Sequence, residues 1–508
     1  MNALSRLHPF ALALVSLALM PFSASAAAPQ QSADLFVATS GSDGGRCTRS
    51  APCASLGRAY AVAKAGDIVE LASGTYGDQE IGGSRNRTGD RVVFRPAAGA
   101  TVALGGVTFD NASRVELRDI RINNWYMRYS SYVVFQNVST RFFFIRASDH
   151  VSLLGGSVGG IQDGTSPTIG NFAGKPPSSD ILVDGVLFHD VGRQENRAAH
   201  IECLFLQEAV GVVIRNSRFT RCDVMDLYVS PVQGGPTASN VLIENNWLDA
   251  PTDGGYYAME IHPDAGTVPH NFTFRFNSVN GGIYIYPDFD YDNVVLDSNI
   301  GRITLCGQSG IAYRYNVWTN QKCGSTDKVA PLSYVNAGAF DLHLKADSPA
   351  LGAGHPKVRP ARDIEGDLRP ARMRPDAGAD QRDPASIVAG KAIGAIHIGD
   401  SESEVKGFYG RPRSTSAGRS TYRVHRGTIW ARYANDRVVA VGTTSRYYTT
   451  AAGVGVGSRL SAAGSVRWLA CRKVFETRGG SGTFLAVRGK GAKAVISGVT
   501  VGAGGGRC

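Results

Sequence analysis

Lysine is scarce in this sequence, and long apolar runs and paired cysteine motifs are missing beyond the N-terminal segment. Each of these features argues against a class of site or structure. Lysine occurs 11 times against 42 arginines in 508 residues, a bias typical of GC-rich bacterial genomes. Only Lys175 lies between Lys64 and Lys322, which argues against a lysine base over that stretch. Beyond residue 28 no apolar run reaches the ~18 residues of a membrane-spanning helix. No CxxC and no HExxH occurs, which excludes zinc ribbons, thioredoxin-type sites and HExxH zinc centres.

Charged residues are also few, at 19%, whereas hydrophobic residues make up 43% and glycine reaches 61 residues. This apolar content is ample for a packed core, so disorder as the main state is excluded. Glycine shows no triplet period, which excludes a collagen helix. A chain of more than ~300 residues indicates several domains or a long repeat array.

The N-terminal segment has the three parts of a secretory signal. Arg6 supplies the positive charge, Phe10 to Met20 form an apolar stretch, and Ala24-Ser25-Ala26 is a small-x-small cleavage site. We therefore expect residues 1–28 to be removed on export and the protein to be secreted or held at the cell surface.

An exported chain is oxidised, so the eight cysteines are expected to form disulfides. Eight cysteines allow 105 connectivities, and pairing of sequence neighbours is the simplest of them. The four close pairs are Cys47/Cys53, Cys203/Cys222, Cys306/Cys323 and Cys471/Cys508.

Short strands followed by asparagine recur through the middle of the chain. In four copies the asparagine stands three residues after an apolar strand residue, at Asn246, Asn277, Asn299 and Asn316. Such strands, separated by Gly, Asn and Asp turns about 20 residues apart, predict the coils of a solenoid. Asparagine suits these turns because it tolerates the left-handed backbone region, and stacked asparagines can hydrogen-bond along the solenoid. The alternative is an antiparallel sandwich with coincidental asparagines.

Motifs at both ends of the repeat region carry a resemblance to a known fold. The entry motifs are Asp34-Leu-Phe-Val, Gly41-Ser42-Asp43, Pro52-Cys-Ala-Ser-Leu56, Ala65-Gly66-Asp67-Ile-Val-Glu-Leu71 and Gly74-Thr75-Tyr76. The exit motifs are Ser348-Pro349-Ala350, Asp363-Ile-Glu-Gly366, Leu368-Arg369-Pro370 and Asp376-Ala377-Gly378-Ala379. Together they resemble secreted right-handed parallel β-helix proteins, the pectate-lyase-like superfold, over about 34–383. The resemblance implies that residues 56–65 form a short helix capping the first coil, and it says little about activity.

The predicted fold is mainly β, in two domains. Residues 32–383 are expected to form a right-handed parallel β-helix of roughly 10 coils. Residues 384–508 are expected to form a small α+β domain, because a capping-box-like helix start at Ser401 and Glu404 precedes alternating strands such as Thr428 to Tyr433.

The net charge of +10 is divided unequally between these two domains. Residues 32–384 hold 33 Lys and Arg against 38 Asp and Glu, a net charge of −5. Residues 385–508 hold 19 against 5, a net charge of +14. The C-terminal domain is therefore expected to dock on an anionic envelope polymer or acidic glycan. Nucleic acid is a poor partner, because neither a recognition helix nor an RNA-binding aromatic motif occurs.

One series of outward polar residues predicts a functional face on the β-helix. Four strands carry polar or aromatic residues at i and i+2, so both members of each pair face one side. The pairs are His200/Glu202, Asp226/Tyr228, Glu260/His262 and Tyr284/Tyr286. Glu202, Asp226 and Glu260 are the acid/base candidates, with His200 and His262 as supports or alternative bases. Tyr228, Tyr284 and Tyr286 are expected to contact sugar rings. A solvated outer face without function is the plainer interpretation.

No cofactor follows from a specific motif. Asp288, Asp290 and Asp292 have the alternate spacing that begins many Ca²⁺ loops, but Asn293 and Asn299 replace the glycine and glutamate that the motif requires. The known motifs of β-helix polygalacturonases, pectate lyases and pectin methylesterases are absent, so no family activity transfers residue by residue. Arg215, Arg218 and Arg221 are expected to support turns.

The sequence therefore favours a secreted, polysaccharide-engaging β-helix protein, with glycan cleavage by a lyase or hydrolase mechanism in a groove on one sheet. The alternative is a non-catalytic adhesin or envelope-binding module whose solenoid is a rigid rod. The two differ in geometry: an enzyme needs carboxylates that converge on one cleft, whereas an adhesin shows splayed acids.

Overall fold

The computed structural model describes most of the chain after residue 30. The described ranges are 31–83, 88–170, 174–193, 201–231, 235–252, 254–255, 257–264, 267–345, 348–366, 369, 374–382, 386–409, 411–424, 427–470, 474–477 and 482–502. The expected signal segment, His200, Cys471 and Cys508 lie outside these residues. Within them, no helix has the length and hydropathy needed to cross a bilayer.

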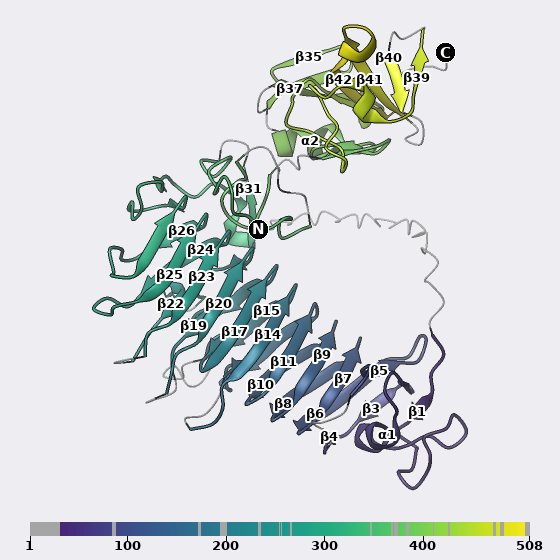
Figure 1. Ribbon diagram of the computed structural model, residues 1–508, viewed down its shortest axis with the longest axis vertical. Coiled ribbons are helices and arrows are strands. Elements are labelled where there is room, and N and C mark those ends of the chain that lie inside the picture. Colours follow the sequence, from purple (N-terminus) through teal and green to yellow (C-terminus); the bar gives the residue numbers. More distant parts are fainter. Residues whose placement is uncertain are drawn as a thin grey trace, which may run out of the picture.

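Twelve parallel strands, one from each successive turn of the chain, form the first wall of a solenoid (Figure 1). They are β1 (Leu35–Val37), β2 (Ile68–Leu71), β5 (Val92–Pro96), β7 (Ser113–Arg118), β9 (Ser131–Gln136), β11 (Asp149–Leu154), β14 (Ser178–Asp184), β17 (Ala209–Arg215), β20 (Ser239–Glu244), β23 (His270–Arg275), β25 (Asp292–Asp297) and β27 (Ile311–Arg314). Each pairs only with the strands one coil before and after it, which is the topology of a parallel β-helix.

The remaining strands of the coils form a second, wider parallel sheet. They are β3 (Gly74–Tyr76), β4 (Gln79–Gly82), β6 (Val102–Asp110), β8 (Arg121–Arg128), β10 (Ser139–Arg146), β12 (Ser157–Gln162), β13 (Thr168–Ile169), β15 (Leu187–Gly192), β16 (Leu204–Leu206), β18 (Arg218–Cys222), β19 (Leu227–Val229), β21 (Trp247–Leu248), β22 (Tyr257–Ile261), β24 (Ser278–Ile285), β26 (Ile300–Ile303), β28 (Val317–Trp318) and β29 (Lys328–Val329). Long strands such as β10 pair with two shorter ones, β12 and β13, so this sheet supplies two walls of each coil.

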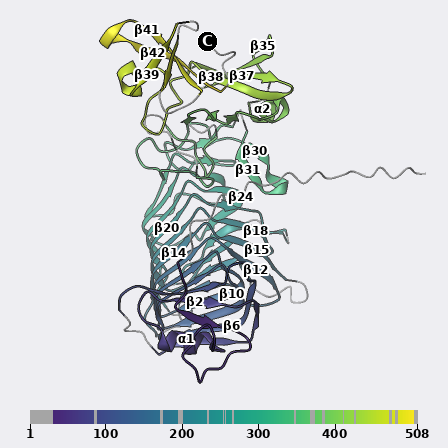
Figure 2. The same cartoon turned by 90° about the vertical axis from the view of Figure 1, so that its right-hand side faces the viewer.

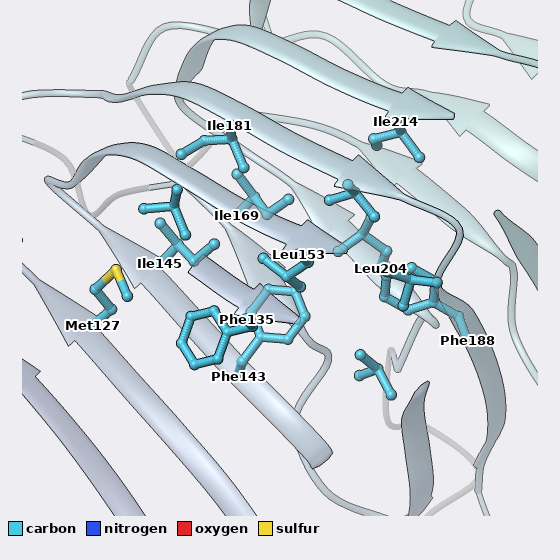
Figure 3. Packing of buried hydrophobic residues seen from close by; sticks show 14 of the residues in the cluster. Met127, Phe135, Phe143, Ile145, Leu153, Ile169, Ile181, Phe188, Leu204 and Ile214 are labelled. Atoms are coloured by element: carbon cyan, nitrogen blue, oxygen red, sulfur yellow. The ribbon is translucent and has the colours of Figure 1, made fainter. Parts of the chain in front are cut away.

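Inward side chains repeat from coil to coil and fill the solenoid with stacked apolar rows (Figure 3). One row runs through Met127, Ile145 and Ile169, which are register partners on β8, β10 and β13. Trp125 stacks between Phe135 and Phe143 at centroid distances of 4.3 and 4.7 Å. The alternation of inward apolar and outward polar residues thus provides the continuous core that a single coil could not form alone.

The repeated asparagines form a buried ladder: Asn246, Asn277, Asn299 and Asn316. Asn277 Oδ1 accepts bonds from the backbone N–H and the Nδ2 of Asn246, both at 3.0 Å, and Asn299 Oδ1 does the same for Asn277. The prediction of stacked asparagines is confirmed. The left-handed backbone, however, falls on the preceding residues, Asn245, Phe276, Ser298 and Tyr315.

The first coil is covered as the resemblance implied. α1 (Leu56–Val62) begins at Ser55, whose hydroxyl accepts the backbone N–H of Arg58, and it buries Leu56, Ala59 and Tyr60 against the solenoid. Figures 1 and 2 place α1 at one end of the β-helix and the C-terminal module at the other. α1 therefore covers the end where the edge of the first coil would otherwise be open, and the module lies beyond the opposite end.

The disulfides Cys47–Cys53, Cys203–Cys222 and Cys306–Cys323 are present, as sequence proximity predicted. After the last coil comes the hairpin of β30 (Tyr334–Asn336) and β31 (Asp341–Leu344), whose strands are joined by a 3-10 turn (Ala337–Ala339). The chain then continues as a segment without long strands, which we call the exit segment; its described residues are 348–366, 369 and 374–382. Buried Arg369 of that segment donates to Asn245 Oδ1 and to the carbonyls of Gly378 and Ala379. The exit motifs thus fasten this segment to the solenoid.

The C-terminal module contains an eight-stranded antiparallel sheet in the order β35-β36-β37-β38-β42-β41-β40-β39. Its elements are β32 (Ile387–Val388), β33 (Ala392–Ile393), β34 (Ile396–His397), α2 (Glu402–Tyr409), β35 (Ser414–Ser416), β36 (Arg419–Val424), β37 (Gly427–Ala434), β38 (Arg437–Thr443), β39 (Val466–Leu469), β40 (Val474–Thr477), β41 (Thr483–Arg488), β42 (Val495–Gly502) and 3-10 turns at Leu460–Ala463 and Gly491–Lys493. Ser401 Oγ accepts the N–H of Glu404 and Glu404 Oε2 accepts the N–H of Ser401, so the predicted capping box is confirmed.

Candidate functional site

Four residues on adjacent strands share one register position on the outside of the β-helix. Phe205 of β16 pairs with Tyr228 of β19, Tyr228 with Glu260 of β22, and Glu260 with Tyr284 of β24. Their neighbours along each strand are buried, so the side chains of these four point outward. His262 and Tyr286 follow two residues after Glu260 and Tyr284 and continue the same face. We call these six residues the outer row.

Three polar groups of the outer row converge. Tyr228 Oη lies 3.1 Å from Nδ1 of His262, within hydrogen-bond distance. Glu260 Oε1 lies 3.6 Å from the same nitrogen. A carboxylate, an imidazole and a phenol on two neighbouring strands thus form a compact group that could exchange protons with a bound molecule.

Aromatic rings flank this polar group. His262 and Tyr286 are stacked at a centroid distance of 3.8 Å and an angle of 6°. Tyr257 stacks on Tyr284 at 4.8 Å, and Phe205 lies 5.0 Å from Tyr228. Flat rings with polar tips, arranged beside ionisable groups, are well suited to contact sugar rings.

Burial sets the protonation of the tyrosines. Partial burial, with the Glu260 and Glu202 carboxylates nearby, raises the pKa of Tyr228 to about 12. Burial also raises the pKa values of Tyr284 and Tyr286, with Glu260 adding to both. Tyr228 therefore stays a phenol at neutral pH and is able to donate a proton.

Two of the three predicted acids precede the strands that form this face. Glu202 and Asp226 are each 1% exposed, whereas Glu260 is 8% exposed and lies within β22, so the prediction that Glu202 and Asp226 line the face as Glu260 does is wrong. Strand alternation fails for them because β16 begins at Leu204 and β19 at Leu227, which leaves both acids in the bends before the strands. His200, their expected partner, lies outside the described residues.

Each buried acid has an internal role in the bend. The hydroxyl of Ser166 donates to Glu202 Oε2 at 2.8 Å. Asp226 Oδ2 accepts the backbone N–H of Asp249 at 2.6 Å and lies within 4.8 Å of the sulfurs of Cys203 and Cys222. Burial, together with the nearby Asp249 carboxylate, raises the pKa of Asp226 well above its usual value. Asp226 is therefore held by backbone contacts and by the disulfide.

The arginines and acids outside the row behave more simply. Arg215 pairs with Asp184 at 2.8 Å and Arg221 Nε with Asp190 at 2.5 Å, which joins neighbouring coils, and Arg218 pairs with Glu365 of the exit segment at 2.5 Å. At Asp288, Asp290 and Asp292, the described residues do not bring three ligand atoms within 4.8 Å of one another. The calcium-loop interpretation therefore gains no support from the structure.

The row extends further than the sequence analysis recognised. Phe205 is in register with Thr168, Thr168 with Phe144, and Phe144 with Tyr126. Tyr126 is 42% exposed and stacks on Phe144 at 5.3 Å. The signal was present in the alternating Phe142 and Phe144, but their registers depend on irregular coil lengths that the sequence does not reveal.

Comparisons with known proteins find similar solved structures but no matching family. No protein-family model and no curated protein matches the chain. Solved structures that are similar include pectate lyase Pel9A, at 16% identity and a TM-score of 0.37 over 68% of this chain and 96% of that one. XylC in complex with xylose matches at 9% identity and a TM-score of 0.38, over 68% and 98%. The A-module of Azotobacter vinelandii mannuronan C-5 epimerase AlgE4 matches at 15% and 0.26, over 55% and 94%. These low TM-scores carry no argument about activity.

Proposed function

We propose that this parallel β-helix protein binds polysaccharide along the outer row and cleaves it by acid–base chemistry at Tyr228, Glu260 and His262. The observation that carries the proposal is the contact of 3.1 Å between Tyr228 Oη and His262 Nδ1, with Glu260 Oε1 at 3.6 Å from the same nitrogen. The register row supplies aromatic rings on both sides of this group, so a linear chain of sugars would contact several coils in turn.

The proposed chemistry assigns one proton transfer to each partner. Tyr228, which burial keeps protonated, donates its proton to the glycosidic oxygen as the bond to the leaving sugar breaks. His262 or Glu260 accepts a proton in return. In a hydrolase that proton comes from the attacking water, and in a lyase it comes from the carbon next to a uronate carboxylate. Arg302 of β26, exposed and in register with Gly282, would neutralise such a carboxylate.

A polysaccharide panel tests the proposal. The full chain is incubated with neutral and uronate polysaccharides, and products are measured both as reducing ends and as the ultraviolet absorbance of unsaturated uronates. Release of either product, with at least ten-fold loss in Tyr228→Phe and His262→Ala, is expected because each variant removes one partner of the proton transfer.

The matched control is a second tyrosine–histidine pair on another wall of the solenoid. Tyr132 of β9 and His150 of β11 stack at a centroid distance of 4.3 Å. Both strands belong to the twelve-stranded sheet, whereas the outer row lies on the other sheet. Tyr132→Phe and His150→Ala should retain full activity. Equal losses in both pairs, or no product from any polysaccharide, would contradict the proposed cleavage.

The second candidate function is a non-catalytic adhesin. It is favoured by the burial of Glu202 and Asp226, which leaves Glu260 as the one predicted acid on the outer row. Saturable binding of an oligosaccharide without product, weakened by Tyr284→Ala and unchanged by Tyr228→Phe, would establish this function instead.

We also propose that the basic C-terminal module holds the protein on an anionic polymer. A concave pocket of about 730 Å³ on this module is lined by Lys406, Arg411 and Arg413 together with Pro412, Ser414 and Thr415. Lys406 is paired with Glu402 at 3.0 Å, which leaves the two arginines as the main attraction for an anion.

Chromatography of the full chain on immobilised polygalacturonate tests this surface. The double variant Arg411→Gln/Arg413→Gln should elute at lower salt than the wild type. It loses two positive charges that attract the polymer, so less salt is needed to screen the attraction that remains. The control Arg467→Gln/Arg488→Gln removes the same charge elsewhere on the module and should shift elution less. Equal shifts would show a diffuse charge effect and contradict a specific pocket.

An oxidising location outside the cytoplasm accompanies these proposals. Its support is the set of three disulfides among the described residues, because such bonds persist in exported proteins and are rare in cytosolic ones.

A further inference from the structure

A second group of ionisable side chains lies where the exit segment packs on the later coils, beside Arg218 of β18 and Trp247 of β21. His343 of β31 and two acids of the exit segment, Glu365 and Asp380, present one nitrogen and two carboxylate oxygens within 4.8 Å of one another. The three residues come from separate stretches of chain, which only the docking of the exit segment brings together.

The imidazole of His343 is held in one orientation. Its Nδ1 lies 2.5 Å from Asp341 Oδ1, and its ring packs edge-to-face on Trp247 at 4.9 Å. Nε2 consequently faces Glu365, whose Oε1 is 3.7 Å away. That distance is too long for a hydrogen bond, but it fits two ligands that share one ion at about 2.0–2.2 Å each. Metal-bound histidines commonly donate their other N–H to a carboxylate in this way.

Charge at the group also favours a cation. The carboxylates of Asp341, Glu365 and Asp380 lie around His343, and Arg218 donates to Glu365 Oε1 at 2.5 Å. Asp380 is only 5% exposed, so one of the three possible ligands is buried beneath the exit segment.

The exit segment also contains two positive charges near Asp380, those of Arg369 and Arg382, which attract its carboxylate. Arg369 is in turn influenced by Asp363, Asp376 and Glu244, and its guanidinium donates to Asn245 and two carbonyls.

The other set of described residues with similar spacing fails a chemical test. Cys203, Cys222 and Asp226 also converge within 4.8 Å, but the two cysteines are joined in a disulfide and cannot bind as thiolates. The group around His343 has no such obstacle.

We propose that His343, Glu365 and Asp380 bind a divalent transition metal ion, with Asp341 as the positioning residue. One imidazole and two carboxylates suit Zn²⁺ or Mn²⁺. The ion would join β31 to the exit segment and so strengthen the attachment of that segment to the last coils, independently of any activity at the outer row.

Calorimetric titration of the EDTA-treated full chain with ZnCl₂ and MnCl₂ tests the site. One equivalent of at least one metal is expected to bind and to raise the melting temperature. Affinity should fall as the pH is lowered, because protonation of His343, whose pKa the surrounding acids raise, competes with the metal. Asp341→Asn should weaken binding by about 10- to 100-fold, since it disturbs the orientation of His343.

The variants His343→Ala and Glu365→Gln should each lose the stoichiometric site. His189→Ala is the matched control, because its Nδ1 also contacts an adjacent carboxylate, that of Asp190, at 2.6 Å. If His343→Ala fails to fold, Glu365→Gln provides the test of metal binding, because it replaces a carboxylate by an amide of nearly the same shape. Absence of 1:1 binding in the wild type, or unchanged binding in folded Glu365→Gln, overturns the proposal.

Discussion

Two polar ladders run along the later coils of the β-helix, and they differ in where their side chains end. The asparagine ladder is inside, where each amide bonds the next at about 3 Å and none is exposed. The outer row is outside, where Tyr228 and His262 are only partly buried and contact each other across strands. A polar residue repeated once per coil therefore indicates structure in one case and a candidate site in the other. Burial and hydrogen-bond partners, which the repeat itself does not show, separate the two.

The largest expected effect is on the inner ladder. Asn277→Leu removes the acceptor of two Asn246 donors and a donor to the Ile243 carbonyl. Leaving buried donors unsatisfied should lower the free energy of unfolding by about 3 kcal/mol or more. Urea denaturation followed by circular dichroism measures this, and a loss below about 1 kcal/mol would show that the ladder contributes little.

The next effect distinguishes an outer acid from an inner one. Glu260→Gln should reduce polysaccharide cleavage by about 100-fold while changing the unfolding free energy by less than about 1 kcal/mol. Glu202→Gln, which retains an oxygen for Ser166, should stay active. Product rates and denaturation curves of both variants are compared. An active Glu260→Gln together with an inactive Glu202→Gln would show that the buried acid, and not Glu260, is needed for cleavage.

A smaller effect concerns Asp226, which the sequence placed on the outer row and the structure places inside. Its folded-state pKa is raised, so as the pH rises the unfolded chain ionises first and the wild type loses stability through the range between the two pKa values. Asp226→Asn cannot ionise and should therefore be more stable than the wild type at neutral pH, whereas the two proteins should differ less at pH 4. Melting temperatures from pH 4 to 8 test this; parallel curves for both proteins would contradict it.

The smallest expected effect is on a third row of asparagines, which is exposed. It separates the contribution of burial to the free energy of unfolding from the contribution of asparagine itself. Asn271 bonds Asn240 and Asn293 through side chains at 2.9 and 2.8 Å, as in the inner ladder, but it is exposed near the start of strand β23, where its φ is positive. Asn271→Gly keeps that backbone conformation and should change the unfolding free energy by less than about 0.5 kcal/mol. A loss comparable to that of Asn277→Leu would mean that stacking of amides, and not burial, stabilises the coils.

Much of the fold followed from local pattern. The capping box at Ser401 and three disulfides were predicted from residues close in sequence, the capping helix at Leu56 was implied by the resemblance to β-helix proteins, and the stacked asparagines were predicted from the repeat. These features depend on short-range geometry that a sequence states directly.

The candidate site followed less completely. Tyr228, Glu260 and Tyr284 were predicted to share a face and do so, because alternation holds within a strand. Glu202 and Asp226 were misplaced because the ends of strands β16 and β19 were not evident, and a shift of one residue at a bend changes which way a side chain points. The group at His343, Glu365 and Asp380 had no sequence signal, since its members are brought together only by docking of the exit segment.

The repeat of short strands predicted a solenoid, the motifs at its two ends implied parallel strands by resemblance, and the positions of Lys and Arg placed the basic charge after residue 384. Only the tertiary structure shows which polar residues are stacked in the interior, which lie on the outer row and which are brought together by the exit segment. Coils of unequal length set the register between strands, and register determines which distant side chains come within contact of one another.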